Sequence, residues 1–265
     1  MKTLMTTVLL SAMSVSIASI NTAFAISAEE QGLAIAKKVE QRDSGWNDYT
    51  TSLKMTLVNK QGDKSTRAIR LKILEMSGDG DKSLTIFDSP RDIKGTAFLS
   101  YSHAVTPDDQ WLYLPALKRV KRISSSNKSG PFMGSQFAYE DLASFEVDKY
   151  QYKFLREETL NGKNTWVVEN QPIYKHSGYT RQIVWIDKER YIPLKIEFYD
   201  RKNTLLKVLQ FQNYTLYLDQ YWRAHEQVME NQQNGKVTTL SLNNFKFRTG
   251  LNQRSFDKNA LKRAR

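Results

Sequence analysis

The sequence contains no cysteine. Disulfides therefore cannot stabilise the protein, and cysteine nucleophiles and cysteine-ligated metal sites are excluded. There are only three histidines, His103, His176 and His225, and their spacing matches neither H-x-x-x-H nor H-E-x-x-H. This spacing argues against a metal site. The protein must obtain its stability from an ordinary hydrophobic core.

The motifs of common enzyme classes are also missing, since the sequence contains neither G-x-S-x-G nor a P-loop. Serines 124–126 lie in a polar, glycine-containing stretch with no base beside them, which is typical of a flexible loop. The carboxylate pairs Asp108-Asp109 and Glu157-Glu158 would point to opposite faces of a strand, so we expect solvated or turn residues rather than an acid–base couple. We therefore predict a protein that is not an enzyme and has no cofactor.

No apolar run is long enough to span a membrane, which needs roughly 20 residues. The longest, residues 8–20, is broken by serines, follows the positively charged Lys2 and precedes the A-x-A sequence Ala23-Phe24-Ala25. This pattern is typical of a secretory signal peptide. We predict cleavage after Ala25 and export of residues 26–265 to the periplasm as one soluble domain. No cysteine follows that could anchor it as a lipoprotein.

Acidic residues are in the minority, with 28 Asp and Glu against 39 Lys and Arg, and the formal net charge is +11. A positive domain of this size indicates an anionic partner, such as nucleic acid, lipid headgroups or an acidic protein face. Export argues against nucleic acid. Transient contact with a membrane surface and contact with an acidic partner both remain.

Residues 27–42 carry the pattern of one amphipathic helix. Ser27 and Glu30 match a capping box, and Leu33, Ala36 and Val39 recur at helical spacing. From residue 53 to residue 247 apolar and polar residues alternate in short runs, separated by turns such as 161–162 and 234–235, both Asn-Gly. We count about eleven to thirteen strands and find no domain boundary.

A large antiparallel sheet with one apolar face must close, fold over or be covered. We therefore predict a mainly β (α+β) fold. Its curved antiparallel sheet forms an unclosed β-barrel, covered by the N-terminal helix and a short helical or loop lid. The interior of such a barrel can hold a ligand as well as side chains.

A basic cluster follows the aromatic stretch W-L-Y-L-P within residues 111–142. One interpretation is an edge strand whose charges prevent aggregation. The other is a docking patch for lipid headgroups or an acidic partner, which the aromatic neighbours favour because aromatic and Arg residues are enriched in interfaces. The cluster consists of Lys118, Arg119, Lys121 and Arg122.

Apolar side chains around residues 132–139 would be costly to expose, at about 1.5–3 kcal/mol each. They must cover the sheet or bind something, and a lid that simply fills the core is an alternative to a ligand-binding one. We expect the cavity and its lid to be lined by ten residues: Phe98, Trp111, Tyr113, Phe132, Met133, Phe137, Tyr139, Leu142, Trp185 and Phe198.

The stretch W-L-Y-L-P-A-L-K-R-V-K-R-I, followed by F-M-G-S-x-F-x-Y-E-D-L, resembles the outer membrane lipoprotein-sorting protein family. That family is a branch of the LolA/LolB-like superfamily of periplasmic lipoprotein carriers. The resemblance implies an unclosed β-barrel with a helical lid, a hydrophobic cavity for acyl chains and no catalytic residues. It also implies an RND-type (MMPL-type) inner-membrane transporter as a handover partner, and lipids fit as cargo as well as lipoproteins do.

We therefore predict a periplasmic carrier that binds acyl chains of a lipoprotein or lipid and passes them towards the outer membrane. The alternative is a non-enzymatic adaptor or scaffold subunit of an inner-membrane transporter, with a packed interior and no cargo. A lipid hydrolase is a third interpretation, which turnover of acyl esters would reveal.

Overall fold

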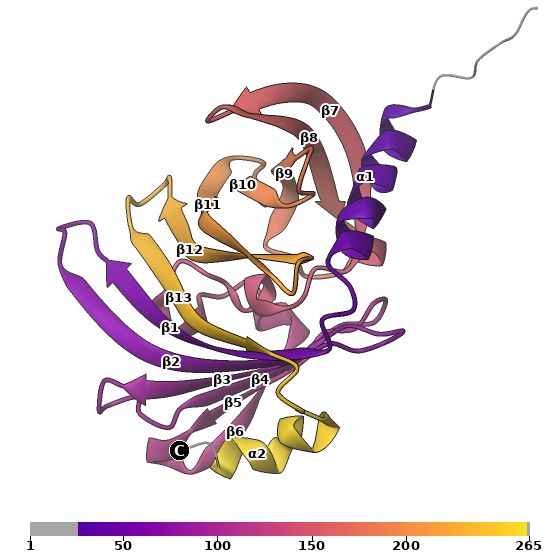
Figure 1. Ribbon diagram of the computed structural model, residues 1–265. Coiled ribbons are helices and arrows are strands. Elements are labelled where there is room, and N and C mark those ends of the chain that lie inside the picture. The colour runs from indigo at the N-terminus through magenta and orange to yellow at the C-terminus, as the bar shows by residue number, and fades with distance from the viewer. Residues whose placement is uncertain (1–25, 264–265) are drawn as a thin grey trace, which may run out of the picture.

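The computed structural model describes residues 26–263, and the predicted signal peptide, residues 1–25, lies outside the described residues. The described chain forms one curved sheet with a helix at each end of the sequence (Figure 1). The elements are α1 (Ala28–Arg42), β1 (Asp48–Val58), β2 (Lys64–Leu74), β3 (Lys82–Ser89), β4 (Ala97–Tyr101), β5 (Asp109–Leu114), β6 (Arg119–Ile123), β7 (Tyr150–Leu160), β8 (Lys163–Pro172), β9 (Tyr179–Asp187), β10 (Pro193–Asp200), β11 (Leu205–Tyr217), β12 (Tyr221–Asn231), β13 (Val237–Phe247) and α2 (Lys258–Arg263).

All thirteen strands of the described chain belong to one antiparallel sheet with the order β6-β5-β4-β3-β2-β1-β13-β12-β11-β10-β9-β8-β7. The two halves, β1–β6 and β7–β13, are meanders that join where β1 pairs with β13. The consecutive strands β6 and β7 form the two opposite edges of the sheet, and the longest connection in the described chain joins them. The predicted mainly β, unclosed barrel is confirmed.

This strand order explains the path of residues 124–149, which we name the crossover segment. Because it joins the two edge strands, it runs across the concave side of the sheet, where Figure 1 shows it as a chain of short turns inside the curve. It contains several short 3₁₀ turns, including Phe132–Gly134 and Tyr139–Leu142. The predicted short helical or loop cover is therefore present.

Helix α1 begins with the predicted capping box, in which the Glu30 backbone N–H donates to Ser27 Oγ (3.1 Å) and the Ser27 backbone N–H donates to Glu30 Oε2 (2.9 Å). The helix packs on β7 (Figure 1). Gly32 faces β7 so closely that a Cβ there would lie 2.8 Å from the backbone nitrogen of Phe154. Glycine at this position lets the helix cover the β7 edge.

The alternation along each strand divides the side chains between two faces. In β4, Phe98 joins the large core on the concave side, whereas Leu99 packs on the convex side against Phe256 and Leu261 at the C-terminus. Helix α2 therefore covers the convex side of β4 and β5 (Figure 1). The sequence analysis did not predict α2.

Candidate functional site

The crossover segment fills the concave side of the β1–β6 half of the sheet. Phe132 is 1% exposed, and its ring centroid lies 5.2 Å from that of Phe98 and 5.4 Å from that of Tyr139. Phe137 is also buried in this cluster. The aromatic residues of the predicted lid are thus part of the main hydrophobic core.

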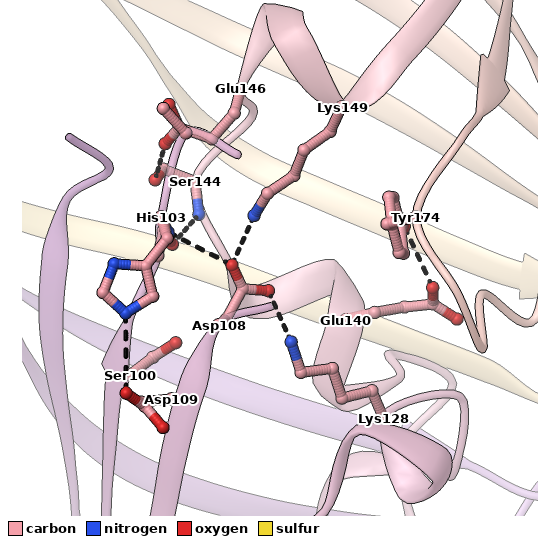
Figure 2. A network of polar contacts seen from close by, with 12 residues as sticks. Ser100, His103, Asp108, Asp109, Lys128, Glu140, Ser144, Glu146, Lys149 and Tyr174 are labelled. Atoms are coloured by element: carbon pink, nitrogen blue, oxygen red, sulfur yellow. Dashed lines mark hydrogen bonds and ion pairs between the residues drawn. The ribbon is translucent and has the colours of Figure 1, made fainter. Parts of the chain in front are cut away.

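Buried ion pairs hold the crossover segment in place. Asp108, in the β4–β5 connection, accepts a hydrogen bond from Lys128 Nζ (2.8 Å) near one end of the segment, and it pairs with Lys149 at the other end (Figure 2). Burial acts to raise the pKa of Asp108, but the hydrogen bonds from the two lysines outweigh it and hold the pKa below its usual value. Asp108 is therefore a buried structural anion, which corrects the expectation of a solvated turn residue.

The middle of the crossover segment is fastened to the other half of the sheet. Glu140 accepts a hydrogen bond from the Tyr174 hydroxyl (3.1 Å; Figure 2). It accepts another from the Gly178 backbone N–H (2.8 Å). Asp141 accepts one from the Tyr179 hydroxyl (2.7 Å) and pairs with Lys207 on β11. These contacts give the segment a defined position inside the barrel.

A cavity of about 670 Å³ remains beside the segment, between α1 and the concave face of β8–β11. Its volume is within the range of about 300–1,000 Å³ that is typical of small-molecule sites. Ala36 and Val39 of α1 face an apolar wall across it. That wall consists of Val168, Val184, Ile186, Ile196 and Phe211.

A second cavity of about 580 Å³ adjoins the first. The two share the lining residues Val39, Asp43, Trp46, Asp81, Ser144, Phe145, Pro193 and Phe211. The lining of the second cavity is richer in aromatic residues. Three arginines line it. Arg190 pairs with Asp187 and Arg223 with Asp43, each at 2.6 Å, and the guanidinium carbon of Arg42 lies 5.1 Å from the centroid of the Tyr191 ring. The aromatic lining residues include Tyr49, Tyr191, Tyr214 and Trp222.

Carboxylates make up a large part of the lining of the larger cavity. Asp81 is the most perturbed of them, because burial and the nearby charges of Glu146, Glu75 and Asp43 raise its pKa to about 7, against a smaller opposing effect of the hydrogen bond from the Met76 backbone N–H. The residues that line this cavity include no Lys, Arg or His. The acidic lining residues are Glu40, Asp43, Glu75, Asp79, Asp81, Glu146 and Asp148.

Most of the ten predicted cavity and lid residues lie on the concave side but pack in its core rather than around the two cavities. Among them, Leu142 lines the smaller cavity, and Phe137 lines a separate cleft of about 370 Å³ beside Lys207. The residues that gather in the concave core are Phe98, Phe132, Met133, Phe137, Tyr139, Leu142 and Phe198.

Three of the predicted cavity residues face the other way. Trp111 and Tyr113 pack on the convex side with the C-terminal residues Phe256 and Leu261. Trp185 belongs to a separate cluster on that face, and its indole N–H donates to Glu158. The physical reason is strand register, since a shift of one residue exchanges the two faces of a strand.

The apolar wall of the cavity was not predicted from the sequence. Its signal was present but weak, since Ile196 stands in an alternating run and Val39 belongs to the predicted helical stripe. The alternation of apolar and polar residues divides the side chains of a strand between its two faces, but it does not show which face lines the cavity. That choice depends on where α1 and the crossover segment lie.

The basic cluster 118–122 lies at the free edge strand β6, and Lys118, Arg119, Lys121 and Arg122 are all exposed. Arg122 pairs with Asp109 on the neighbouring strand β5. The side chains of Arg119 and Lys121 are on the face of Ile123, opposite to that of Arg122. Both sequence interpretations, edge protection and docking, are compatible with this position.

No helix within residues 26–263 is both long and apolar enough to cross a membrane. A single antiparallel sheet curved around a hollow, with α1 across its open side, defines an unclosed β-barrel of the LolA-like type.

Comparison with known proteins agrees with this class. A domain from Vibrio parahaemolyticus, named for outer membrane lipoprotein sorting, shares 59% identity, with a TM-score of 0.87 over 88% of this chain and 99% of that one. A DUF1329 family protein from Desulfovibrio piger shares 30% identity, with a TM-score of 0.84 over 89% of this chain and 99% of that one. A LolA superfamily protein from Nitrosomonas europaea shares 21% identity, with a TM-score of 0.69 over 89% and 100% of the two chains, and supports the fold.

A family model described only as an uncharacterized protein matches residues 79–263. No curated protein matches the sequence. The chain belongs to the outer membrane lipoprotein-sorting protein family.

Proposed function

We propose that the protein is a non-enzymatic periplasmic carrier that holds acyl chains of a lipoprotein or lipid and passes them towards the outer membrane. The observation that supports this most directly is the cavity of about 670 Å³ with an apolar wall on β8–β11. Hydrocarbon buried there gains roughly 0.8 kcal/mol per methylene. The name of the Vibrio parahaemolyticus relative, which refers to lipoprotein sorting, points in the same direction.

In this proposal the acyl chain enters beside α1 rather than under the crossover segment. The segment carries the aromatic residues of the core and is fastened at both ends and in the middle. The helix, by contrast, packs mainly on the single edge strand β7. Movement of α1 away from β8 and β9 would widen the cavity without breaking the core of the β1–β6 half.

The basic cluster 118–122, at and just before β6, is the proposed docking patch. Its partner would be lipid headgroups or an acidic face of an RND-type inner-membrane transporter. Lys118, Arg119 and Lys121 form no ion pair within 4.0 Å in the described chain, so their charges are available to a partner. The free backbone edge of β6 could add hydrogen bonds to such a contact.

A fluorescent fatty acid tests the carrier function. The wild-type protein should bind it, and Ile196→Trp, which fills the cavity with a large ring, should reduce the affinity at least ten-fold. Leu155→Trp provides a matched control, because Leu155 is 37% exposed and does not line either cavity. Equal binding by the two variants would contradict the proposed site.

The second candidate is an adaptor subunit of an inner-membrane transporter that carries no cargo. The filled interior of the β1–β6 half favours it. Under this hypothesis the wild-type protein would not bind the fatty acid. Replacement of Lys118, Arg119, Lys121 and Arg122 by serine would nevertheless abolish co-purification with a transporter.

A further inference from the structure

The acidic lining of the larger cavity contrasts with the chain as a whole, whose formal net charge is +11. Seven carboxylates line this cavity, and none of its lining residues is basic. Such a concentration of one charge in a partly enclosed space creates a strong local potential. Some of these carboxylates are neutralised by other groups of the protein, and others are not.

Three of the seven carboxylates have strong partners in the described chain. Asp43 pairs with Arg223 (2.6 Å), and Asp79 lies 2.8 Å from His103 Nδ1. Glu75 accepts hydrogen bonds from two backbone N–H groups, those of Gly45 and Asn47, at 2.6 Å each.

Asp81 and Glu146 differ from Asp43 and Asp79, because neither forms an ion pair within 4.0 Å in the part of the chain that the structure describes. Asp81 accepts one hydrogen bond from a backbone N–H group, that of Met76 (3.1 Å), whereas Glu75 accepts two. Asp81 and Glu146 are linked through Ser144, whose hydroxyl donates to Glu146 Oε1 (2.5 Å) and accepts from the Asp81 backbone N–H (3.2 Å). The lysines nearest in sequence have other partners, since Lys149 pairs with Asp108 and Lys82, next to Asp81, donates to Gln253 Oε1 (3.3 Å). Two adjacent carboxylates at the cavity therefore have no cation of their own.

A second and independent observation points to a ligand in the same cavity. Asn170 lines it from β8 and is only 5% exposed, and its Oδ1 has no hydrogen-bond partner. A buried acceptor without a donor costs about 1–3 kcal/mol. Asn170 is opposite Gln182 in the β8–β9 register, and both stand among valines and isoleucines of the apolar wall. The wall thus contains a polar position that a bound molecule with a donor would satisfy.

A metal ion is not the expected occupant. Within residues 26–263 no group of three or more His, Asp or Glu side chains is arranged to hold a metal. An organic cation requires less exact geometry, because an ammonium group can approach two carboxylates and donate up to three hydrogen bonds.

We propose that the ligand of this cavity is an amphiphile whose head carries an ammonium group. Its hydrocarbon part lies on the wall formed by Val168, Val184 and Ile196, its ammonium group lies at Asp81 and Glu146, and a donor of the head reaches Asn170. This inference rests on the proposed carrier function and adds the chemical class of the cargo. The ammonium group could belong to an aminophospholipid or to a lysine beside the acylated residue of a lipopeptide.

A chain-matched series of simple amphiphiles tests the proposal. Dodecylamine, dodecanol and dodecanoate are titrated into the full mature chain at pH 8, below their aggregation concentrations, and binding is followed by calorimetry. We expect dodecylamine to bind at least ten-fold more tightly than dodecanol, and dodecanoate to bind most weakly. If dodecylamine binds no more tightly than dodecanol, the ammonium preference is wrong but the carrier function stands. If dodecanol and dodecanoate do not bind either, the carrier function also fails.

Substitutions assign the preference to the named residues. Asp81→Asn and Glu146→Gln should each reduce the affinity for dodecylamine at least three-fold and leave that for dodecanol unchanged. Asn at position 81 keeps an acceptor for the Met76 backbone N–H, so the turn should survive. Glu230→Gln is the matched control, since Glu230 is an exposed acid on β12 outside the cavity. An equal loss in the control, or an unchanged preference in both cavity variants, would overturn the assignment.

Two further pairs of ligands separate the sources of the ammonium group. One pair is lysophosphatidylethanolamine and lysophosphatidylglycerol of equal chain length, and the other is an acylated peptide with Lys or with Gln beside the acylated residue. A preference for the ammonium member in one pair supports the proposal and identifies the source. No preference in either pair contradicts it.

Discussion

Lys207 and Asp141 form an ion pair inside the barrel, with Lys207 Nζ 2.6 Å from Asp141 Oδ2 and with side chains that are only 4% and 5% exposed. The lysine is on β11 and the aspartate is in the crossover segment, so the pair joins the segment to the far half of the sheet. Lys207 also donates to the backbone oxygen of Gln136 (2.9 Å). The two groups therefore fix the position of the segment that fills the barrel.

Replacement of Lys207 by methionine should destabilise the protein by about 3–5 kcal/mol, because it leaves the Asp141 carboxylate buried without its cation. Urea denaturation at pH 7 measures the effect. Arg156→Met is the comparison: Arg156 is 51% exposed and pairs with Glu158 at 2.6 Å, so the loss there should be below about 1 kcal/mol. Similar losses in the two variants would show that the buried pair is not a fixed point of the structure.

Phe132→Ala should destabilise the protein by about 3–5 kcal/mol, since the ring is fully buried between Phe87, Phe98 and Tyr139. At a temperature where the variant remains folded, its affinity for a fluorescent fatty acid should equal that of the wild type. A selective loss of fatty-acid affinity in the folded variant would instead make Phe132 part of the binding site, as the sequence analysis expected.

Gly32→Ala should destabilise the protein, although alanine is more favourable than glycine inside a helix by about 1 kcal/mol. The added Cβ would lie 2.8–2.9 Å from backbone atoms of Lys153 and Phe154, so α1 would have to move away from β7. We expect a loss of about 1–3 kcal/mol in urea denaturation. Ala34→Gly, at an exposed position of the same helix, should cost about 1 kcal/mol by propensity alone. An increase in stability for Gly32→Ala would show that the helix does not press on β7.

The contribution of Asp81 to the free energy of unfolding should fall as the pH rises from about 4 to about 7. Its pKa is raised from 3.8 to about 7, so the folded state binds more protons than the unfolded state in this interval. Burial also raises the pKa of Glu146, against the opposing charge of Lys149, and the pKa of Asp43, against that of Arg223. Because both pKa values stay above their usual level, Glu146 and Asp43 change the stability with pH in the same direction as Asp81.

Asp81→Asn should therefore be more stable than the wild type at pH 8 by roughly 1–3 kcal/mol, since one pKa unit corresponds to about 1.4 kcal/mol, and the difference should largely vanish at pH 4. Urea denaturation at the two pH values measures it. A variant that loses stability equally at both pH values would show that Asp81 acts as a structural acceptor rather than as a buried charge.

Local patterns were sufficient to predict the elements of the fold. Ser27 and Glu30 form the predicted capping box, and the predicted Asn-Gly turns at 161–162 and 234–235 join β7 to β8 and β12 to β13. One-sided alternation over many strands led to the unclosed barrel, because an exposed apolar face must be covered. Helix α2 was missed because it has only six residues and depends on contacts with β4 and β5.

The site was harder to predict because it depends on contacts between distant residues. Asp108 is bound by lysines 20 and 41 positions away, so its sequence neighbours did not indicate its burial. Trp111 and Trp185 were expected to line the cavity, but strand register places them on the convex side. The carboxylates around the larger cavity come from α1, the β2–β3 turn and the end of the crossover segment, which only the folded chain brings together.

Native mass spectrometry can detect the cargo of the mature protein, isolated without detergent from the periplasm of the cells that produce it. We expect a population that carries one acyl-chain molecule per protein chain, and this population should disappear in Ile196→Trp. A wild-type protein that carries no such molecule, and that takes none up when lipid is supplied, would contradict the proposed carrier function.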